Sequence, residues 1–519
     1  MGSPLPNAGT LLIASIYGSS QAELRRQMAE AIEQGADALE LRLDLCEGLT
    51  DDDLRQIAED AHPPLILTIR SATEGGGWDG KDDDRVSRLI ELGPIAGLID
   101  VELELWRRSA NVRQKIGLAL HRKEDLAMAR RLLLSKHDQT TRPASLHKDF
   151  LDMIDTRKCS VPKIAYRART VRDNFEAFDL MRTSPKRPIA ICMGPDGAPS
   201  RILAKKFSAF GTFASLSNDR TTAPGQLSIE TLKLVYRWDS IGPHTSVYGL
   251  IGNPIAHSLS PRIHNHAFTF TGTDAVYVPF RVDDSYESFK AFMVEVVDRP
   301  WLDLRGLSIT VPHKENAIRF AIERGSDVDD VARRIGSANT FKFDATGRLS
   351  AFNTDAPAFA DEMLDLCRSD AKGLRGKSAA ILGAGGMARA AIRSLLDFEM
   401  TVTVYNRTDQ RAGSLATSMG CNWRPWQDRL TDSSALLINC TSAGSNDEGS
   451  LLPPASVTNH SFIFDAQYRS DETRLVRDAS AAGISARGGL GMLLRQAARQ
   501  FYIWTGHQLT CEQLKEALP

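Results

Sequence analysis

The stretch LLIASIYG at residues 11–18 is the first of eight short apolar, strand-like runs that follow one another through the first 240 residues. Amphipathic stretches with helical periodicity separate most of the runs, as in QAELRRQMAEAIEQG at residues 21–35. Eight strands, each followed by a helix, predict a (β/α)8 barrel over residues 10–238. The other seven runs begin at residues 38, 64, 98, 131, 161, 188 and 210.

A second series of strand-like runs begins with VYGLIG at residue 247. Between the two series, residues 239–246 carry Gly, Pro and polar residues, which predicts a linker. Helical stretches alternate with the later runs, and this alternation predicts an open α/β architecture of two lobes.

Composition places the 519-residue chain among globular proteins, with 42% hydrophobic and 25% charged residues. The 63 Lys and Arg against 65 Asp and Glu give a net charge of −2, so neither nucleic acid nor an anionic membrane is expected as a partner. No apolar run reaches the length of a membrane span, and the first ten residues do not resemble a signal peptide. Seven widely spaced cysteines without a CxxC pair predict reduced thiols, a cytoplasmic location and no metal site.

Charged residues lie inside the apolar runs of the predicted barrel, toward the C-terminal ends where barrel active sites lie. Glu40 and Arg42 are two residues apart and therefore face the same way. His137 ends the fifth run. Lys163 lies in the sixth, flanked by apolar residues, where desolvation is expected to favour its free, nucleophilic amine. A structural salt bridge is the alternative interpretation, because charges in apolar strands are costly unless paired or used.

A nucleophilic Lys, a nearby His and several Arg predict Schiff-base chemistry on an anionic keto acid. The imine acidifies the adjacent C–H bond, so that His137 can take this proton and later protonate a leaving hydroxyl. Arginines would hold the carboxylate of the substrate. A class I aldolase, which breaks a C–C bond, would use the same lysine chemistry.

The barrel half resembles type I 3-dehydroquinate dehydratase, a family whose motifs argue against the aldolase. The matching motifs are E-L-R-L-D from Glu40, IRSATEGG from Ile69, S-x-H-D from Ser135, PKIA from Pro162, G-x-x-S-R ending at Arg201 and APGQ from Ala223. The resemblance implies that Lys163 forms the Schiff base and that His137 is the general acid and base. It also implies a set of substrate-binding residues, namely Ser15, Glu40, Arg42, Arg70, Glu74, Arg201, Thr222 and Gln226.

The stretch ILGAGGMARAA at residues 381–391 has the pattern of a dinucleotide-binding turn between a strand and a helix. Its glycines permit close approach of the backbone to a pyrophosphate at the helix N-terminus. The next run ends at Asn406, where an acidic residue would hold the ribose of NAD. Arg407 and Arg411 follow instead and favour the 2′-phosphate of NADP, although solvated arginines at a helix start would look the same.

Polar residues also gather upstream of this turn, at Ser258, Ser260, Thr310, Lys314, Asn339 and Asp355. A Lys–Asp pair is often only a weak surface salt bridge. Here the lysine follows a strand and the aspartate precedes a helix, which predicts a place at a lobe interface, where substrate pockets form.

Residues 246–519 resemble shikimate dehydrogenase through GNPIAHSLSP, SITVPHK, GSANT, NTD, GAGG-x-A-R-A, NRTxxRA and GGLGMLLRQ. The resemblance implies a substrate-binding lobe over residues 247–355, completed by 488–519, and a Rossmann NADP-binding lobe over 356–487. Lys314 and Asp355 would be the catalytic pair. Substrate would be held by Ser258, Ser260, Thr310, Asn339, Tyr468 and Gln496. The cofactor would be held by Gly383, Ala384, Gly385, Gly386, Met387, Asn406, Arg407, Thr408 and Arg411, with Thr441, Gly489 and Met492 on the nicotinamide side.

The two resemblances together predict a bifunctional enzyme of the shikimate pathway, because the first activity makes 3-dehydroshikimate and the second reduces it to shikimate. The expected partners are these small molecules, and the oligomeric state stays open. A reductase half that prefers quinate is an alternative. A catalytically inactive metabolite sensor is another, but it would be expected to lose Lys163, His137, Lys314 or Asp355, and all four are present.

Overall fold

The structure is a computed structural model that describes residues 9–61, 63–120, 131–441, 443, 451–468 and 472–518. The chain divides into two compact units, Met1–Ser246 with Asp274–Arg281, and Val247–Thr273 with Val282–Pro519. Among the helices of the described residues, none combines the length and apolar character that a membrane crossing needs.

The first unit contains a sheet of eight parallel strands in the order β7-β6-β5-β4-β3-β2-β1-β8. The segments that lead into β7 and β8 are joined by a hydrogen bond from the Phe210 N–H to the Pro188 carbonyl, 2.7 Å long, so the sheet nearly closes. The predicted barrel fold is confirmed. Its strands are β1 (Leu11–Ile16), β2 (Ala38–Arg42), β3 (Leu65–Thr68), β4 (Leu98–Glu102), β5 (Arg131–Asp138), β6 (Cys159–Arg167), β7 (Ile189–Met193) and β8 (Gly211–Ala214).

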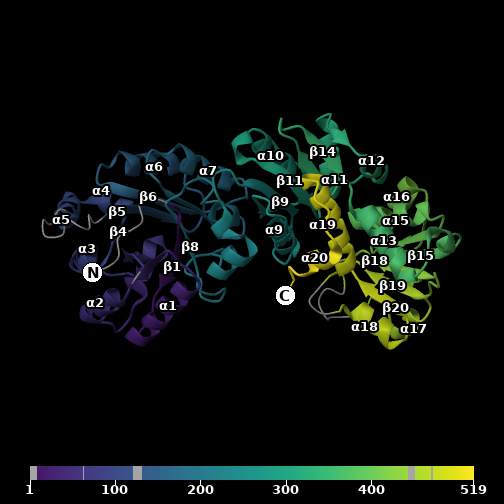
Figure 1. Cartoon of the computed structure of the whole chain (residues 1–519), viewed down its shortest axis with the longest axis horizontal. Coiled ribbons are helices and arrows are strands. Elements are labelled where there is room, and N and C mark those ends of the chain that lie inside the picture. Colours follow the sequence, from purple (N-terminus) through teal and green to yellow (C-terminus); the bar gives the residue numbers. More distant parts are fainter. Residues whose placement is uncertain are drawn as a thin grey trace. The chain divides into compact units, whose positions relative to one another are not determined.

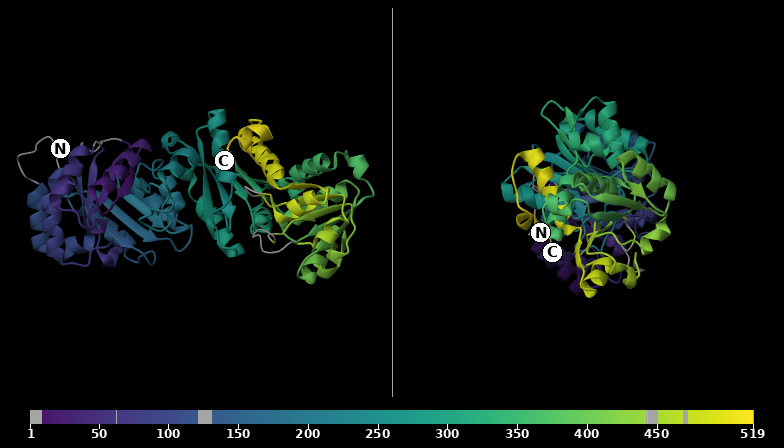
Figure 2. Two further views of the ribbon diagram at one scale, coloured as in Figure 1. Left: turned by 90° about the horizontal axis from the view of Figure 1, so that it is seen from below. Right: turned by 90° about the vertical axis from the view of Figure 1, so that its right-hand side faces the viewer.

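Helices surround the barrel strands on the outside (Figures 1 and 2). Seven of the eight strands are followed by α-helical segments, whereas β8 is followed by the π-helical turn η4 (Thr231–Val235). A helical segment therefore follows every strand, as the sequence predicted, and the last of them is π-helical. The helices are α1 (Gln21–Glu33), α2 (Asp51–Asp60), α3 (Asp82–Leu92), α4 (Leu103–Arg108), α5 (Ala110–Leu120), α6 (Leu146–Asp155), α7 (Asp173–Thr183) and α8 (Ala198–Ile202).

The inward side chains of the barrel change character along each strand. Successive residues of a strand face opposite sides, so residues two apart share a side. Ile66 and Leu133 belong to the apolar cluster that fills the start of the barrel. Two residues later, Thr68 and Ser135 are buried and hydrogen-bonded to carboxylates. The apolar starts provide the core, and the polar ends form one face of the barrel that can carry a site.

Another sheet is mixed and has six strands in the order β10-β9-β11-β13-β14-β12. Strand β11 runs parallel to β9 and antiparallel to β13. The strands are β9 (Ser246–Gly252), β10 (Ala275–Arg281), β11 (Leu304–Ile309), β12 (Asp327–Val328), β13 (Thr340–Phe343) and β14 (Leu349–Phe352). The helices between them are α9 (Ser260–Thr271), α10 (Tyr286–Val297), α11 (Lys314–Glu323) and α12 (Asp330–Ile335).

A third sheet is parallel throughout, with the order β17-β16-β15-β18-β19-β20. Numbered along the chain from β15, this is the 3-2-1-4-5-6 order of a Rossmann fold, which confirms the predicted architecture. The strands are β15 (Ser378–Leu382), β16 (Thr401–Tyr405), β17 (Asn422–Trp423), β18 (Leu436–Asn439), β19 (Phe462–Asp465) and β20 (Ser485–Gly488). The helices are α13 (Asp355–Cys367), α14 (Ala371–Leu374), α15 (Gly386–Asp397), α16 (Asp409–Met419), α17 (Pro454–Val457), α18 (Arg474–Ala481), α19 (Leu490–Thr505) and α20 (Cys511–Lys515).

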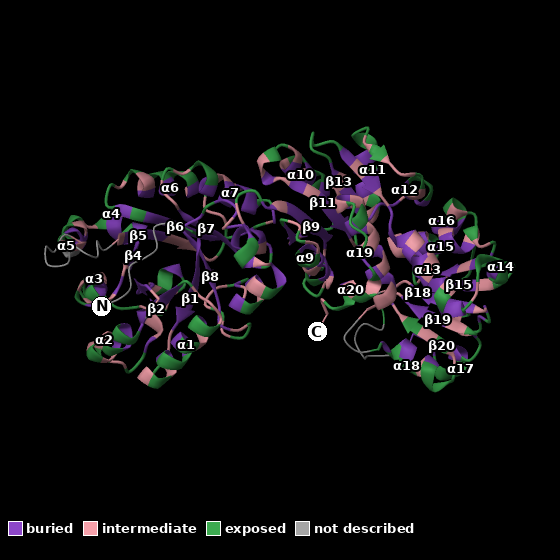
Figure 3. Ribbon diagram, in the orientation of Figure 1, coloured by how far each residue is buried: buried purple, intermediate pink, exposed green. Residues whose placement is uncertain are grey.

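Both faces of this parallel sheet are covered, since its central strands β15, β18 and β19 are almost entirely buried (Figure 3). Ile381 of β15 faces a cluster that includes Phe359 of α13 and Ile392 of α15. Its neighbour Leu382 faces the opposite cluster, with Val457 of α17 and others. The alternation of strand side chains therefore supplies two cores, one on each side of the sheet.

Helix α19 leaves the third sheet and packs on the second (Figure 2). Trp504 donates its indole N–H to the Phe341 carbonyl at 2.9 Å, and the Ser308 hydroxyl donates to the Gln500 side chain at 2.9 Å. The end of the chain therefore stabilises the sheet that precedes the Rossmann lobe.

Candidate functional sites

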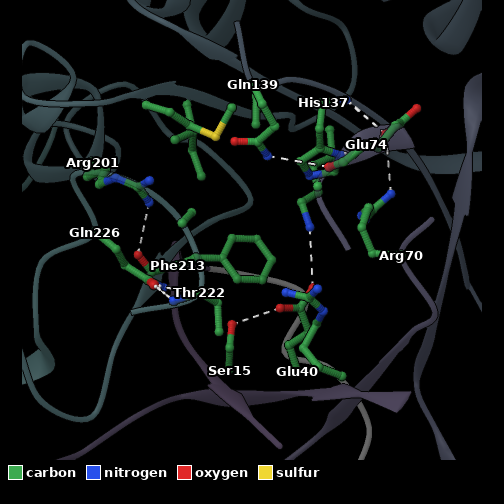
Figure 4. Close-up of a pocket in the computed structure, with 17 residues that line it drawn as sticks. Ser15, Glu40, Arg70, Glu74, His137, Gln139, Arg201, Phe213, Thr222 and Gln226 are labelled. Atoms are coloured by element: carbon green, nitrogen blue, oxygen red, sulfur yellow. Dashed lines mark hydrogen bonds and ion pairs between the residues drawn. The ribbon is translucent and has the colours of Figure 1, made fainter. Parts of the chain in front are cut away.

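A pocket opens among the polar ends of the barrel strands and encloses about 520 Å³, its open mouth included. All ten residues that the sequence predicted for the barrel site line it, from seven strands or the loops that follow them (Figure 4). They are Ser15, Glu40, Arg42, Arg70, Glu74, His137, Lys163, Arg201, Thr222 and Gln226.

Lys163 is 4% exposed, as its place in an apolar strand predicted, but two carboxylates lie beside its amine. Its Nζ is 3.2 Å from the nearer Asp100 oxygen and 3.4 Å from the nearer Glu40 oxygen. The Phe213 ring lies under the amine, 4.0 Å from Nζ to the ring centroid. The apolar neighbours along the chain do not reveal these carboxylates, because residues across the barrel surround the amine.

Asp100 connects the lysine to a buried arginine. Its carboxylate lies 2.7 Å from the Arg70 guanidinium and accepts a hydrogen bond from the Ser135 hydroxyl at 2.5 Å. Burial alone would raise the pKa of Asp100, but the charges of Arg70 and Lys163 hold it below its ordinary value. Asp100 is therefore a buried anion that two cations share.

His137 and Glu74 form a second buried pair in the pocket. The His137 ring nitrogen Nδ1 is 3.0 Å from the Glu74 carboxyl oxygen, which also accepts the His137 backbone N–H at 2.9 Å. Burial, followed by the charges of Arg70 and Lys163, lowers the pKa of His137 well below its ordinary value. Burial, aided by the nearby charge of Glu102 and opposed by Arg70, raises the pKa of Glu74 to about 8. At neutral pH the pair is therefore uncharged, and the imidazole can accept a proton.

Arg201 is almost completely buried on the other side of the pocket. Its guanidinium donates to the Phe213 carbonyl at 3.2 Å, while its Nε has no hydrogen-bond partner among the described residues. Burial lowers the pKa of Arg201 to about 10. A buried cation in a pocket without a carboxylate partner is suited to bind an anion. Nearby, Gln226 accepts hydrogen bonds from the Thr222 backbone N–H and hydroxyl.

Several residues of this site were missed by the sequence analysis. Asp100 and Glu102 stand two apart in the fourth apolar run, the same signal that identified Glu40 and Arg42. Glu102 lies 3.4 Å from Arg70 and 2.8 Å from Arg85, and so fixes Arg70 from the far side. Other missed residues that line the pocket are Gln139, Phe213, Ile191 and Met193.

The second unit brings Lys314 and Asp355 together, with 2.6 Å between Nζ and the carboxylate oxygen. Each is the first residue of a helix, Lys314 of α11 and Asp355 of α13. Both are largely buried, so this is not the exposed salt bridge that was the alternative interpretation. Tyr468 lies close enough for its hydroxyl to interact with Ser258 and with the charge of Lys314. Burial, opposed by these two neighbours, raises the pKa of Tyr468.

The other predicted substrate residues of the second unit are partly engaged within the fold. Asn339 accepts the Thr354 backbone N–H at 2.8 Å and donates to the Thr354 hydroxyl at 2.9 Å, so it fixes the turn before Asp355. The Ser260 backbone N–H donates to the Ser258 hydroxyl at 3.3 Å. Thr310 is half-buried just after β11, and Gln496 donates to the Leu493 carbonyl within α19.

The glycine-rich turn after β15 has the geometry that a pyrophosphate site requires. Gly383 has φ of +115°, a conformation that side chains rarely adopt, and a Cβ there would press on Cys440 and Thr441. A Cβ at Gly385 would meet nothing within 4 Å, so open space lies over the turn. A Cβ at Gly386 would lie 3.1 Å from the Lys314 side chain, which brings the turn next to the Lys–Asp pair. Ala384 and Met387 pack partly against the Rossmann core.

Arg407, Thr408 and Arg411 are exposed after β16, where the sequence predicted a 2′-phosphate site. Within the described part of the chain, neither arginine is paired with a carboxylate. Asn406 donates to the Thr408 carbonyl at 3.0 Å and shapes this turn. Of the residues predicted on the nicotinamide side, Thr441 donates to Asn439, Gly489 packs on the Ala466 carbonyl, and Met492 is buried in the Rossmann core.

Family models match both units. Type I 3-dehydroquinase matches residues 12–243, and the shikimate dehydrogenase substrate binding domain matches 250–341. Shikimate / quinate 5-dehydrogenase matches 365–444, and the shikimate 5′-dehydrogenase C-terminal domain matches 489–509. The bifunctional 3-dehydroquinate dehydratase/shikimate dehydrogenase of Arabidopsis thaliana, described as chloroplastic, is 31% identical over 96% of this chain and 82% of its own.

The chain belongs to the family of bifunctional 3-dehydroquinate dehydratase/shikimate dehydrogenases.

Other relatives are similar to the second unit alone. The shikimate dehydrogenase (NADP(+)) of Natronomonas pharaonis is 36% identical over 52% of this chain and 98% of its own. The crystal structure of shikimate dehydrogenase from Aquifex aeolicus is 32% identical, with a TM-score of 0.48, and covers 53% of this chain and 98% of its own. The predicted family is confirmed, so the first unit is a dehydratase of the lyase class and the second an oxidoreductase.

The raised pKa of Glu74 makes the stability of the barrel depend on pH. The folded barrel keeps this proton up to about pH 8, whereas the unfolded chain loses it near pH 4.5. The stability that the proton contributes is fully present below pH 4.5 and is lost as the pH rises to about 8. Between pH 5 and 8, the free energy of unfolding is expected to fall more steeply in the wild type than in Glu74→Gln, by at most about 1.4 kcal/mol per pH unit.

Urea unfolding of the full chain at pH 5, 6.5, 8 and 9 checks this expectation. Glu47→Gln, which changes an exposed carboxylate of the same unit, serves as the control and is expected to follow the wild type. Parallel pH curves for the wild type and Glu74→Gln would show that Glu74 is ionised at neutral pH.

Proposed function

We propose that the barrel dehydrates 3-dehydroquinate to 3-dehydroshikimate through a Schiff base on Lys163, and that the second unit reduces this product to shikimate with NADPH. The buried amine of Lys163 carries the proposal for the first step. It shares one pocket with the neutral His137 and with Arg201, a cation that has no carboxylate partner among the described residues. The Lys314–Asp355 pair beside the glycine turn carries it for the second.

The barrel residues have complementary roles in the dehydration. Lys163 attacks the ketone carbon, and loss of water gives an imine that draws electrons from the neighbouring C–H bond. His137 takes the proton from that carbon, and the C–O bond at the next carbon then breaks. The same imidazolium gives its proton to the departing hydroxide, which leaves as water. Hydrolysis of the imine returns the amine of Lys163 and releases the unsaturated ketone.

Arg201 supplies the binding energy for the substrate carboxylate. A guanidinium that has already lost its water, and that has no carboxylate of its own in the described structure, gains a full charge-assisted contact when the anion binds. Asp100 and Glu40 hold the amine of Lys163 at the opposite side of the pocket. The substrate is therefore fixed between a cation for its carboxylate and an amine for its ketone.

The second unit fits a bound NADPH. The open space over Gly385 and the left-handed Gly383 suit the pyrophosphate, and the exposed pair Arg407 and Arg411 suits the 2′-phosphate. Bound NADPH would supply the hydride. Lys314 would give a proton to the carbonyl oxygen of the substrate, and Asp355, 2.6 Å away, would orient the lysine and exchange the proton.

The proposed sites also define the domains of the chain. We assign residues 10–238 to the dehydratase, 239–246 to the linker, 247–355 with 488–519 to the substrate lobe, and 356–487 to the NADP lobe. The seven cysteines are unpaired thiols, which supports a reducing, cytoplasmic setting. The small-molecule substrates are the only partners that the proposed chemistry requires.

A coupled assay with 3-dehydroquinate and NADPH tests both steps in the same chain. The wild type is expected to oxidise NADPH, whereas Lys163→Ala is expected to lose this activity and keep the reduction of supplied 3-dehydroshikimate. Borohydride added with 3-dehydroquinate is expected to label the peptide that contains Lys163, because it reduces the imine to a stable amine. Lys148→Ala removes an exposed barrel lysine and should leave both activities unchanged. A label on another lysine, or full turnover by Lys163→Ala, would disprove the Schiff-base assignment.

Lys314→Ala is expected to lower kcat for shikimate oxidation by roughly 10²- to 10⁴-fold, because a positioned acid/base contributes about that much. NADPH binding, followed by nucleotide fluorescence, is expected to persist, since the glycine turn is unchanged. The dehydratase activity of the same variant is the internal control. A near-normal kcat would reduce Lys314 to a structural role, and quinate as the better substrate would favour the alternative reductase.

Arg407→Ala is expected to raise KM for NADPH by about 10- to 100-fold and to change KM for NADH little. The loss of one charge-assisted contact to the 2′-phosphate, about 1.5–3 kcal/mol, accounts for this range. Arg375→Ala, an exposed arginine of the same unit, is the matched control. Equal use of NADH and NADPH by the wild type would contradict the proposed cofactor preference.

A further inference from the structure

Gln139 lines the dehydratase pocket, although neither the sequence motifs nor the proposed mechanism gives it a task. It follows directly after β5, the strand that carries His137. In Figure 4 its carboxamide lies at the rim of the pocket, beside His137 and Glu74.

Two contacts fix the orientation of this carboxamide. The Gln139 Nε2 donates a long hydrogen bond of 3.4 Å to the Glu74 carbonyl. The side chain also lies against Gly75, where a Cβ would stand 2.6 Å from Nε2 and 2.9 Å from Cγ. Gly75 has φ of +83°, a conformation that favours glycine, so the backbone beneath the carboxamide stays free of a side chain. The carboxamide is thus held in place before any ligand binds.

With Nε2 turned toward Glu74, the amide oxygen of Gln139 faces the pocket (Figure 4). Figure 4 shows Oε1 on the side away from His137 and Glu74. No hydrogen bond to Oε1 is formed by any residue that the structure describes. The pocket is otherwise rich in donors, and the carboxyl groups of Glu40 and Glu74 already accept hydrogen bonds from their neighbours. Oε1 is therefore an uncharged acceptor, held in place and open to a ligand.

We propose that Gln139 determines substrate specificity in the dehydratase, and that its Oε1 accepts a hydrogen bond from a ring hydroxyl that does not react. The inference rests on the proposed function, because it requires a hydroxylated keto acid in this pocket. An uncharged acceptor suits this task, since it recognises a hydroxyl without repelling the substrate carboxylate. The contact with Gly75 lowers the cost of binding, because the side chain is already ordered.

Gln139→Met tests the proposal with the full chain. Methionine keeps the unbranched length that packs on Gly75 but offers only a weak acceptor. KM for 3-dehydroquinate is expected to rise by about 2- to 10-fold, the range for one neutral hydrogen bond, with kcat changed less than about 2-fold. Gln114→Met, at an exposed position of α5, is the matched control and should change neither constant.

Substrate analogues identify the contact itself. For the deoxy analogue that lacks the contacted hydroxyl, the wild type and Gln139→Met are expected to have equal KM values, whereas other deoxy analogues keep the difference. If Gln139→Met does not fold, as judged by thermal unfolding, the wild type alone still tests the proposal. The KM of the wild type should then be about 2- to 10-fold higher for the one deoxy analogue that lacks the contacted hydroxyl, and normal for the other deoxy analogues.

An unchanged KM for Gln139→Met, or the same increase for every analogue, would overturn the inference. A change confined to the pH profile of kcat would also overturn it, because Gln139 would then act only by positioning Glu74. Two measurements on the wild type test the proposed function independently of Gln139. They are the turnover of 3-dehydroquinate and the labelling of Lys163 with borohydride. Their failure would disprove the dehydratase mechanism, whereas their success with an unchanged variant would disprove only the role of Gln139.

Discussion

The contact of the Asp100 carboxylate with both Lys163 and Arg70 is the interaction on which the barrel pocket depends. Three buried charges meet there, at 3.2 Å and 2.7 Å, in a place almost closed to water. Removing one partner of such a cluster leaves an uncompensated charge, which costs far more than the cluster gains in stability. The cluster therefore positions the Lys163 amine and the Arg70 guanidinium, and it adds little to the stability of the fold. Glu102 and Arg85 continue the network behind Arg70 and fix its position.

Burial divides the remaining charges of the pocket into two kinds. Burial favours the neutral forms of His137 and Glu74, and at Glu74 it outweighs the opposing charge of Arg70. Arg201 stays a cation without a carboxylate among the described residues. A neutral base and an unsatisfied cation in one pocket are what a reaction on an anionic substrate needs, since the first can take a proton and the second can bind the charge.

The site of the second unit is formed by helix starts and a glycine turn, not by the strand ends of one barrel. Lys314 and Asp355 begin helices that follow strands of the mixed sheet, and the glycine turn of the Rossmann sheet approaches the same lysine. Helix α19 then returns to the mixed sheet through Trp504 and Gln500. The site is thus assembled where α11, α13 and the glycine turn meet. A Cβ at position 386 would lie 3.1 Å from the Lys314 side chain, so the lysine would have to shift slightly to admit one.

The sequence by itself determined the elements and the chemistry of the strand ends. Strand periodicity is a local property, so the runs that contain Glu40, His137 and Lys163 could be located and their inward faces assigned. The fingerprint at Gly383 was equally local, because it needs only a strand, a turn and a helix. The tertiary structure decided which groups meet. Asp100 lies 63 residues from Lys163 along the chain, and Glu74 lies 63 residues from His137. Only closure of the barrel brings them into contact, and the burial that follows sets which of them carry charge.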